Sequence, residues 1–167
     1  MGRDGQAVVR LRFGRPFVDT QLVFPGLAPL YATLAVIAEP LLRVAVGAFL
    51  IPHGGQKLFG WFGADPAGER GLFEEVGLKP AASWIALIGM VQFVGGILLV
   101  VGLLTRPVAL VVAISMLGTA WFVTHRDGWF WNRRGMEYSL FWAIAAFVVF
   151  CNGGGAFSLD ALLGREF

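Results

Sequence analysis

The chain is poor in charged residues. Lysine, arginine, aspartate and glutamate make up 14% of its 167 residues, whereas a soluble domain carries about 25%. Hydrophobic residues make up 57% of the chain, and the mean hydropathy is +0.71. This composition is typical of a protein embedded in a lipid bilayer. The net charge of +2 is small and the arginines are scattered, which argues against nucleic acid as a partner.

Cysteine and histidine are also scarce. The single cysteine, Cys151, excludes an intramolecular disulfide and a CxxC redox pair, and we expect it to pack as a small side chain in the last apolar segment. The two histidines, His53 and His125, lack the third protein ligand of a convincing metal site. We therefore predict no metal and no redox cofactor belonging to the chain itself, so that electrons come from another protein or from a bound quinone.

Four long apolar segments dominate the sequence, and each approaches the ~20 helical residues that cross the ~30 Å hydrocarbon layer. The link Thr105-Arg106-Pro107 between two of them permits only an antiparallel hairpin. We predict an all-α integral membrane protein, an antiparallel four-helix bundle. The segments are 29–59, Ala81–Leu104, Pro107–Thr124 and Tyr138–Asn152.

The first 38 residues are predicted to be an extension, made of a basic tail and an apolar interfacial segment. Prolines at 25, 29, 40 and 52 leave two alternatives for the first helix. Either residues 22–38 form a separate interfacial piece before a span from Leu41 to about Phe59, or one long bent helix covers both. The sequences GLFEEVGL (71–78) and SLDALLG (158–164) predict short surface helices.

The basic residues divide almost evenly between the two sides of such a bundle. The N-terminal cluster of arginines at 3, 10, 12 and 15 favours a cytoplasmic N-terminus, and four spans return the C-terminus to the same side. Near this side, Glu39 and Arg43 stand four residues apart, a spacing that predicts a local ion pair.

The most specific polar feature lies at the other, outer end of the first helix. His53, Gln56 and Lys57 stand at i, i+3 and i+4 and hence on one helical face. Structural interpretations are available, because Lys57 can extend to the interface and Trp61 can join an aromatic belt. For His53, a structural hydrogen bond and a role in ligand or proton binding are equally compatible with the sequence.

Three further candidates belong to this outer end. His125 and Arg126 close the third apolar segment and Glu137 opens the fourth, so the topology predicts one polar cluster in which Glu137 pairs with Lys57 or Arg126. An aromatic lid would cover it, made of Trp61, Trp129 and Trp131.

A glycine-lined face marks the second apolar segment. Gly89, Gln92 and Gly96 share this face, where small residues permit close approach of a neighbouring helix or a ligand. Packing between helices is the favoured interpretation, with a ligand contact of Gln92 as the alternative.

Several of these motifs, taken in order, resemble the DoxX family over residues 40–163. They are Arg43…His53-Gly-x-Gln56-Lys57-Leu-Phe-Gly, Gly95-Gly96-x-Leu-Leu…Gly102-Leu-Leu-Thr105-Arg106, Glu137-Tyr138 and Ser158-Leu-Asp160. The resemblance implies a small four-helix membrane domain, here 39–163, associated with oxidoreductase complexes of bacteria and archaea. Some relatives are membrane subunits of a thiosulfate:quinone oxidoreductase. Where members of the family often have an acid, this chain has Gln92, which weakens a proton-relay role there.

The sequence and the resemblance together predict a non-catalytic membrane subunit of a respiratory or sulfur- or stress-related oxidoreductase complex. It would sit in the bacterial cytoplasmic membrane among other redox subunits, anchor or stabilise the complex, and have a quinone as its one candidate ligand. The alternatives are a small stand-alone transporter and a lipid-binding assembly protein. Apart from Gln92 the midplane of the predicted bundle is apolar, which argues against a transporter.

Overall fold

The computed structural model describes residues 24–165, and these fold into helices and connecting loops without a strand. This confirms the predicted all-helical class. Short 3-10 turns cover Pro25–Leu27, Trp61–Gly63, His125–Asp127 and Trp131–Arg133. The main helices are α1 (Ala28–Phe59), α2 (Pro66–Glu75), α3 (Ala81–Val101), α4 (Thr105–Gly118), α5 (Glu137–Asn152) and α6 (Leu159–Leu162), and a π-helical segment at Thr119–Thr124 continues α4.

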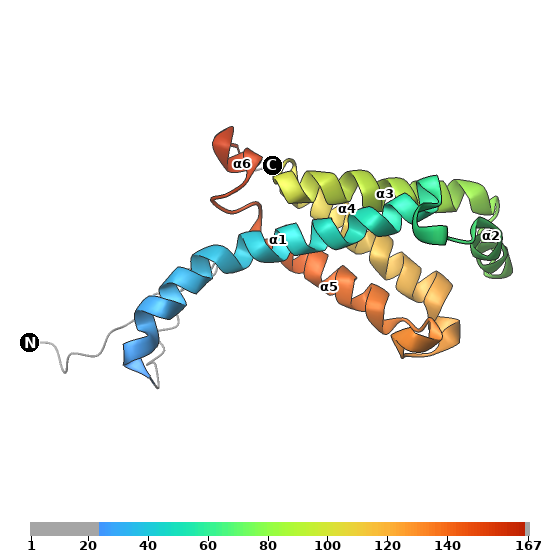
Figure 1. Ribbon diagram of the computed structural model, residues 1–167, viewed down its shortest axis with the longest axis horizontal. Helices are drawn as coiled ribbons and strands as arrows, with labels where there is room; N and C mark the ends of the chain where they lie inside the picture. The colour runs from blue at the N-terminus through green and yellow to red at the C-terminus, as the bar shows by residue number, and fades with distance from the viewer. Residues whose placement is uncertain (1–23, 166–167) are drawn as a thin grey trace, which may run out of the picture.

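Four of these helices form the bundle. α1 packs chiefly on α3, and α4 chiefly on α5. The two pairs diverge toward the end of the bundle that carries α2, as Figure 1 shows. We call this the open end. At the opposite, closed end, α3 turns into α4, α5 ends, and the C-terminal segment with α6 lies against the bundle (Figure 1).

Three helical stretches are long and apolar enough to cross a membrane: Ala28–Phe59, Ala81–Val101 and Thr105–Asp127. The chain is therefore a membrane protein. The fourth bundle helix, α5, is apolar but has 16 residues, or ~24 Å at 1.5 Å per residue, and falls short of a full span. The residues before it form a folded loop instead of a further helical turn.

The first helix is the longer of the two predicted alternatives. α1 is one continuous helix of 32 residues with Pro40 and Pro52 inside it, and its N-terminal part extends past the bundle (Figure 1). Leu30, Leu34 and Ile37 are exposed there. Of the predicted interfacial piece, residues 22–23 lie outside the described residues, as does the basic tail.

Glycines bring α1 and α3 together. A Cβ placed on Gly54 would collide with the backbone of Phe93, and one on Gly47 would collide with the carbonyl oxygen of Gly96. On the facing side, a Cβ on Gly89 would press against Lys57 and Leu58. The glycine face predicted on α3 thus serves close helix packing.

The turn between α3 and α4 lies three residues earlier than predicted. It is formed by Gly102, Leu103 and Leu104, with φ of 72° at Gly102 and 51° at Leu104. Thr105–Pro107 belongs to the first turn of α4. Proline is tolerated there because an N–H in the first helical turn has no acceptor within the helix.

Both predicted surface helices are present with shifted bounds. α2 begins at Pro66, where Asp65 accepts a hydrogen bond of 3.1 Å from the Ala67 N–H as an N-cap. Its Phe73 is buried against Ala81, Ile85 and Val123, which fixes α2 to the open end. α6 is a single turn, capped by Ser158.

Candidate functional site

Charged side chains at the closed end bind backbone groups. Arg43 is 1% exposed and donates hydrogen bonds to the carbonyl oxygens of Leu99 and Val100 at the end of α3, and to Phe157 O at 2.7 Å. The predicted local pair with Glu39 is therefore wrong. The last carbonyl oxygens of a helix lack N–H donors within it, and the Arg43 guanidinium donates to two of them in α3 at once.

Asp160 complements Arg43 at the same end. Its carboxylate accepts hydrogen bonds of 2.8 Å from the N–H groups of Leu104 and Thr105, at the α4 N-terminus, where the helix dipole favours negative charge. Arg106 donates to the carbonyl oxygens of Phe150 and Cys151 in the last turn of α5. The charged side chains of the closed end thus bind backbone groups at the ends of α3, α4 and α5.

Cys151 departs from its predicted role in packing. Its side chain is exposed, because it lies on the outer face of α5 while Ala145, Ala146 and Val149 face the core.

A cleft of about 520 Å³ occupies the open end, where the two helix pairs diverge. Its floor and walls combine polar and apolar side chains, the latter including Phe73, Ile88 and Val123. The polar lining residues are His53, Lys57, Glu69, Thr119, Thr124, Arg134, Tyr138 and Ser139. We refer to it as the open-end cleft.

His53 and Tyr138 meet in this cleft. The His53 Nε2 and the Tyr138 hydroxyl share a hydrogen bond of 2.7 Å, and the two rings pack edge to face with centroids 5.6 Å apart. Either group can donate, according to the imidazole tautomer. The pair links α1 to α5 across the opening, and both residues line the cleft.

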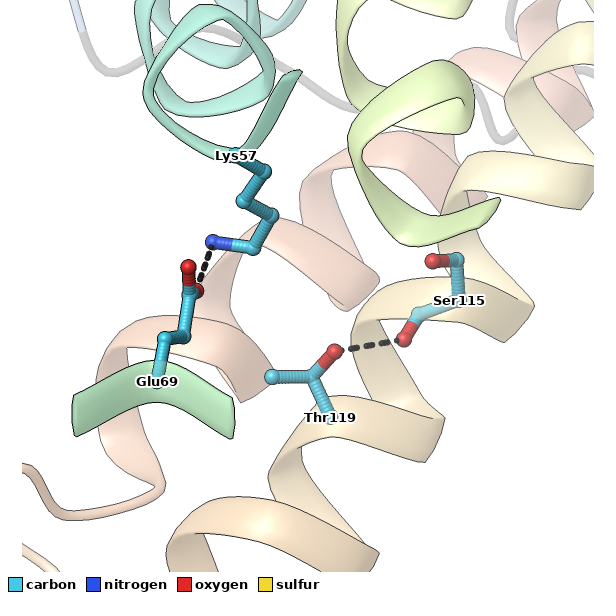
Figure 2. A network of polar contacts seen from close by, with 4 residues as sticks. All are labelled: Lys57, Glu69, Ser115 and Thr119. Atoms are coloured by element: carbon cyan, nitrogen blue, oxygen red, sulfur yellow. Dashed lines mark hydrogen bonds and ion pairs between the residues drawn. The ribbon is translucent and has the colours of Figure 1, made fainter. Parts of the chain in front are cut away.

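Lys57 pairs with an acid that the sequence did not single out. Its Nζ lies 2.8 Å from Glu69 Oε1, and Figure 2 shows the ammonium pointing from the end of α1 to α2. The predicted pairing of Glu137 with Lys57 or Arg126 is wrong. Glu137 instead accepts a hydrogen bond of 2.9 Å from the Trp131 N–H, and Arg126 donates to the Glu75 carbonyl.

The π-helical segment supplies another wall. The Thr119 hydroxyl donates to the Ser115 carbonyl oxygen at 3.0 Å (Figure 2), and the Thr124 hydroxyl donates to the Ala120 carbonyl oxygen at 3.2 Å. Such segments are frequent at functional sites because the wider helical turn changes where side chains point.

The loop before α5 is tightly built. Backbone hydrogen bonds join Met136 N to Gly128 O and Glu137 N to Trp129 O, each at 3.0 Å. A Cβ on Gly135 would collide with the backbone of Trp129. This packing presents Arg134, whose φ is 62°, and Trp131 to the open-end cleft.

Of the remaining predicted residues, only Gln56 stays with His53. Its side chain lies close enough to His53 for a side-chain hydrogen bond, and it lines an adjoining pocket of about 350 Å³ with Lys57, Glu69 and Arg134. Gln92 is buried in the bundle. His125 stacks on Trp121 and, like Arg126, is not among the lining residues of the cleft.

The predicted aromatic lid is likewise divided. Trp131 lines the open-end cleft, and Trp129 lines a neighbouring groove on α5. Trp61 instead packs on Gly55 and Phe93, between α1 and α3. Across residues 24–165, no three His, Cys, Asp or Glu side chains gather in a geometry suited to a metal ion.

Sequence reasoning found His53 and Lys57 but missed their partners. In the sequence Tyr138 stands out only as part of a motif, and neither Glu69 nor Arg134 is singled out. The placement of Tyr138 at the start of the last helix was an available signal, since that helix begins at the same end at which the first one finishes. No local signal identifies Glu69.

A family model described as DoxX matches residues 38–125, more than half of the chain. The match runs from the middle of α1 to the end of the π-helical segment. It includes Arg43, His53 and Lys57 but not α5 with Tyr138. No curated protein and no solved structure matches the chain.

Proposed function

This chain belongs to the DoxX family, and on that premise we propose that it is a membrane subunit of an oxidoreductase complex that holds a quinone head group in the open-end cleft. The complex is anchored through the exposed apolar part of α1, and its electrons come from a partner subunit. The cleft contacts the quinone without being a complete redox centre.

The observation that carries this proposal is the His53–Tyr138 pair. It offers a hydrogen-bond donor within a cleft that also has apolar walls, which is the combination a quinone head group requires. A carbonyl oxygen of the quinone accepts a hydrogen bond from the hydroxyl or from a ring N–H. Reduction to the quinol takes up two electrons and two protons, and the paired imidazole and phenol are suited to pass protons to the ligand.

Anchoring is supported by the part of α1 that extends past the bundle. Its exposed apolar residues include Leu30, Leu34 and Ile37. A helix that is apolar on all sides is suited to lipid or to contact with another membrane-spanning helix. Residues of this part are available to a partner without disturbing the packing of α1 on α3.

The test is Tyr138→Phe, which removes one hydroxyl. In the complex isolated under mild detergent, we expect quinone-linked turnover to fall about tenfold, the loss of a hydrogen bond worth about 1.4 kcal/mol. Subunit composition, measured by mass spectrometry, stays unchanged. His53→Ala has the same or a larger effect.

The matched control is Tyr31→Phe, which alters the only other tyrosine in the chain, on the exposed part of α1. It leaves turnover unchanged. Normal turnover per assembled complex in both Tyr138→Phe and His53→Ala would exclude the quinone contact and leave anchoring as the function. A complex without any redox enzyme among its copurifying proteins would exclude both parts of the proposal.

A further inference from the structure

A second cavity, of about 440 Å³, runs between α3 and α4 next to the open-end cleft. Its lining is almost entirely apolar and includes Trp84, Val91, Ile114, Gly118 and Phe122. We call it the α3–α4 groove. Three residues line both cavities, Ile88, Thr119 and Val123, so the groove begins where the cleft ends.

Gly118 is the feature of this groove that needs an explanation. Glycine weakens a helix relative to alanine, and it is usually retained where φ is positive or where a neighbour approaches closely. Neither reason applies, because Gly118 has φ of −60° and a Cβ there would meet no atom within 4 Å. By contrast, Gly47 and Gly54 are in direct contact with the backbone of α3. The absence of a side chain at Gly118 keeps the groove open.

The boundary between the cleft and the groove offers no free hydroxyl. The hydroxyl of Thr119 is bonded to the carbonyl of Ser115 within its own helix (Figure 2). The other two shared residues, Ile88 and Val123, are aliphatic. A hydrocarbon chain can therefore lie across this boundary without covering an unbonded polar group at the shared positions.

We propose that the α3–α4 groove holds the isoprenoid tail of the quinone whose head group lies beside His53 and Tyr138. This inference rests on the proposed function and adds the route of the tail. The occupant is a single long hydrocarbon chain attached to a compact polar head, because one apolar groove adjoins the hydrogen-bonding pair through an apolar boundary. In a bilayer the tail is already out of water, so its binding to the groove is stabilised by van der Waals packing and not by the hydrophobic effect.

The test fills the groove by Gly118→Leu in the purified full chain. Binding is followed by quenching of tryptophan emission on titration with a long-tailed ubiquinone, and separately with its tail-less benzoquinone head. We expect affinity for the long-tailed quinone to fall about tenfold, while affinity for the tail-less head stays within about twofold of the wild type. Partition of the tail into detergent cancels, because variant and wild type are titrated in the same micelles.

Two matched pairs of variants protect this test. Gly71→Leu on α2 is the control for Gly118→Leu, since a Cβ at Gly71 also meets no atom within 4 Å and this residue does not line the groove. Ile114→Trp fills the groove from an exposed position, and Leu117→Trp, exposed on the same helix, is its control. If Gly118→Leu does not fold, the test is decided by the affinity of Ile114→Trp for the long-tailed quinone relative to that of Leu117→Trp.

The outcomes separate this inference from the proposed function. If the groove-filling variants lose affinity for the long-tailed quinone alone, the result supports the proposed position of the tail in the groove. If the groove-filling variants lose affinity for both quinones equally, or for neither, the proposed position of the tail is wrong, while the cleft remains a quinone site. A fall only in copurified phospholipid also overturns the proposed position, and assigns the groove to a lipid acyl chain. A wild-type chain that binds neither quinone overturns the proposed function and this inference with it.

Discussion

The two ends of the bundle use similar polar side chains in opposite ways. At the closed end, Arg43 and Asp160 are each 1% exposed and bind backbone groups at the ends of α3 and α4. At the open end, Lys57 and Glu69 bind each other, and His53 shares its hydrogen bond with another side chain. A side chain bound to backbone ends holds the fold, whereas side-chain pairs lining a cleft can exchange partners with a ligand.

The strongest way to break this comparison is to remove Arg43. Arg43→Met keeps much of the side-chain volume but leaves buried carbonyl oxygens without donors, each costing about 1–3 kcal/mol. We expect the free energy of unfolding, measured by SDS titration, to fall by about 3–5 kcal/mol, as when one partner of a buried charged network is lost.

The matched control is Arg70→Met, because Arg70 is exposed on α2 at the open end. It changes stability by less than about 0.5 kcal/mol. Similar losses in Arg43→Met and Arg70→Met would mean that the closed end does not carry the fold in the way described.

A second prediction concerns the glycines of α1 that pack against α3 between the two ends of the bundle. Gly54→Ala places a methyl group against the backbone of Phe93, which cannot move as a flexible side chain would. We expect a loss of about 1–3 kcal/mol from overpacking. Gly118→Ala, with open space around its Cβ, is the control and stabilises by up to about 1 kcal/mol. The two variants are compared by thermal unfolding in detergent. If Gly54→Ala is as stable as the wild type, α1 and α3 are not in the close contact described here.

The smallest expected effect belongs to the Lys57–Glu69 pair. Their side chains are 16% and 25% exposed, so Glu69→Gln should cost about 0.2–1 kcal/mol. We expect faster amide exchange confined to α2, because the pair ties that helix to α1, and high salt should produce part of the same change in the wild type. Glu74→Gln, exposed on the same helix, is the control. If Glu69→Gln lowers the free energy of unfolding as much as Arg43→Met does, the two ends do not differ in the way described.

Local patterns predicted the fold far better than the contacts of the site. Apolar length gave the bundle helices, and helical spacing placed Gly89 and Gly96 on the face that meets α1. The same local reasoning failed for Arg43, because Glu39 stands one turn away whereas the true acceptors lie 56, 57 and 114 residues along the chain.

In the site, too, local features could be predicted from the sequence, whereas contacts between distant residues could not. His53 was recognised from its position near a helix end, but its partner Tyr138 is 85 residues away, and only the packing of α1 beside α5 brings them together. The π-helical segment and the open groove beside Gly118 have no sequence signal of comparable strength. Both depend on how α4 meets its neighbours.

The position of Asp160 in the chain has a consequence for biosynthesis. A ribosome delivers all four bundle helices before it delivers the residue that caps α4, and Phe157, which accepts from Arg43, also arrives late. Chains grow at about 5–20 residues per second, so the helices are in place for a short interval before the closed end can be completed. A nascent chain arrested shortly before Asp160 should therefore already have its helices in the membrane yet remain sensitive to protease at the α3–α4 turn, and should acquire resistance only when the final segment is released.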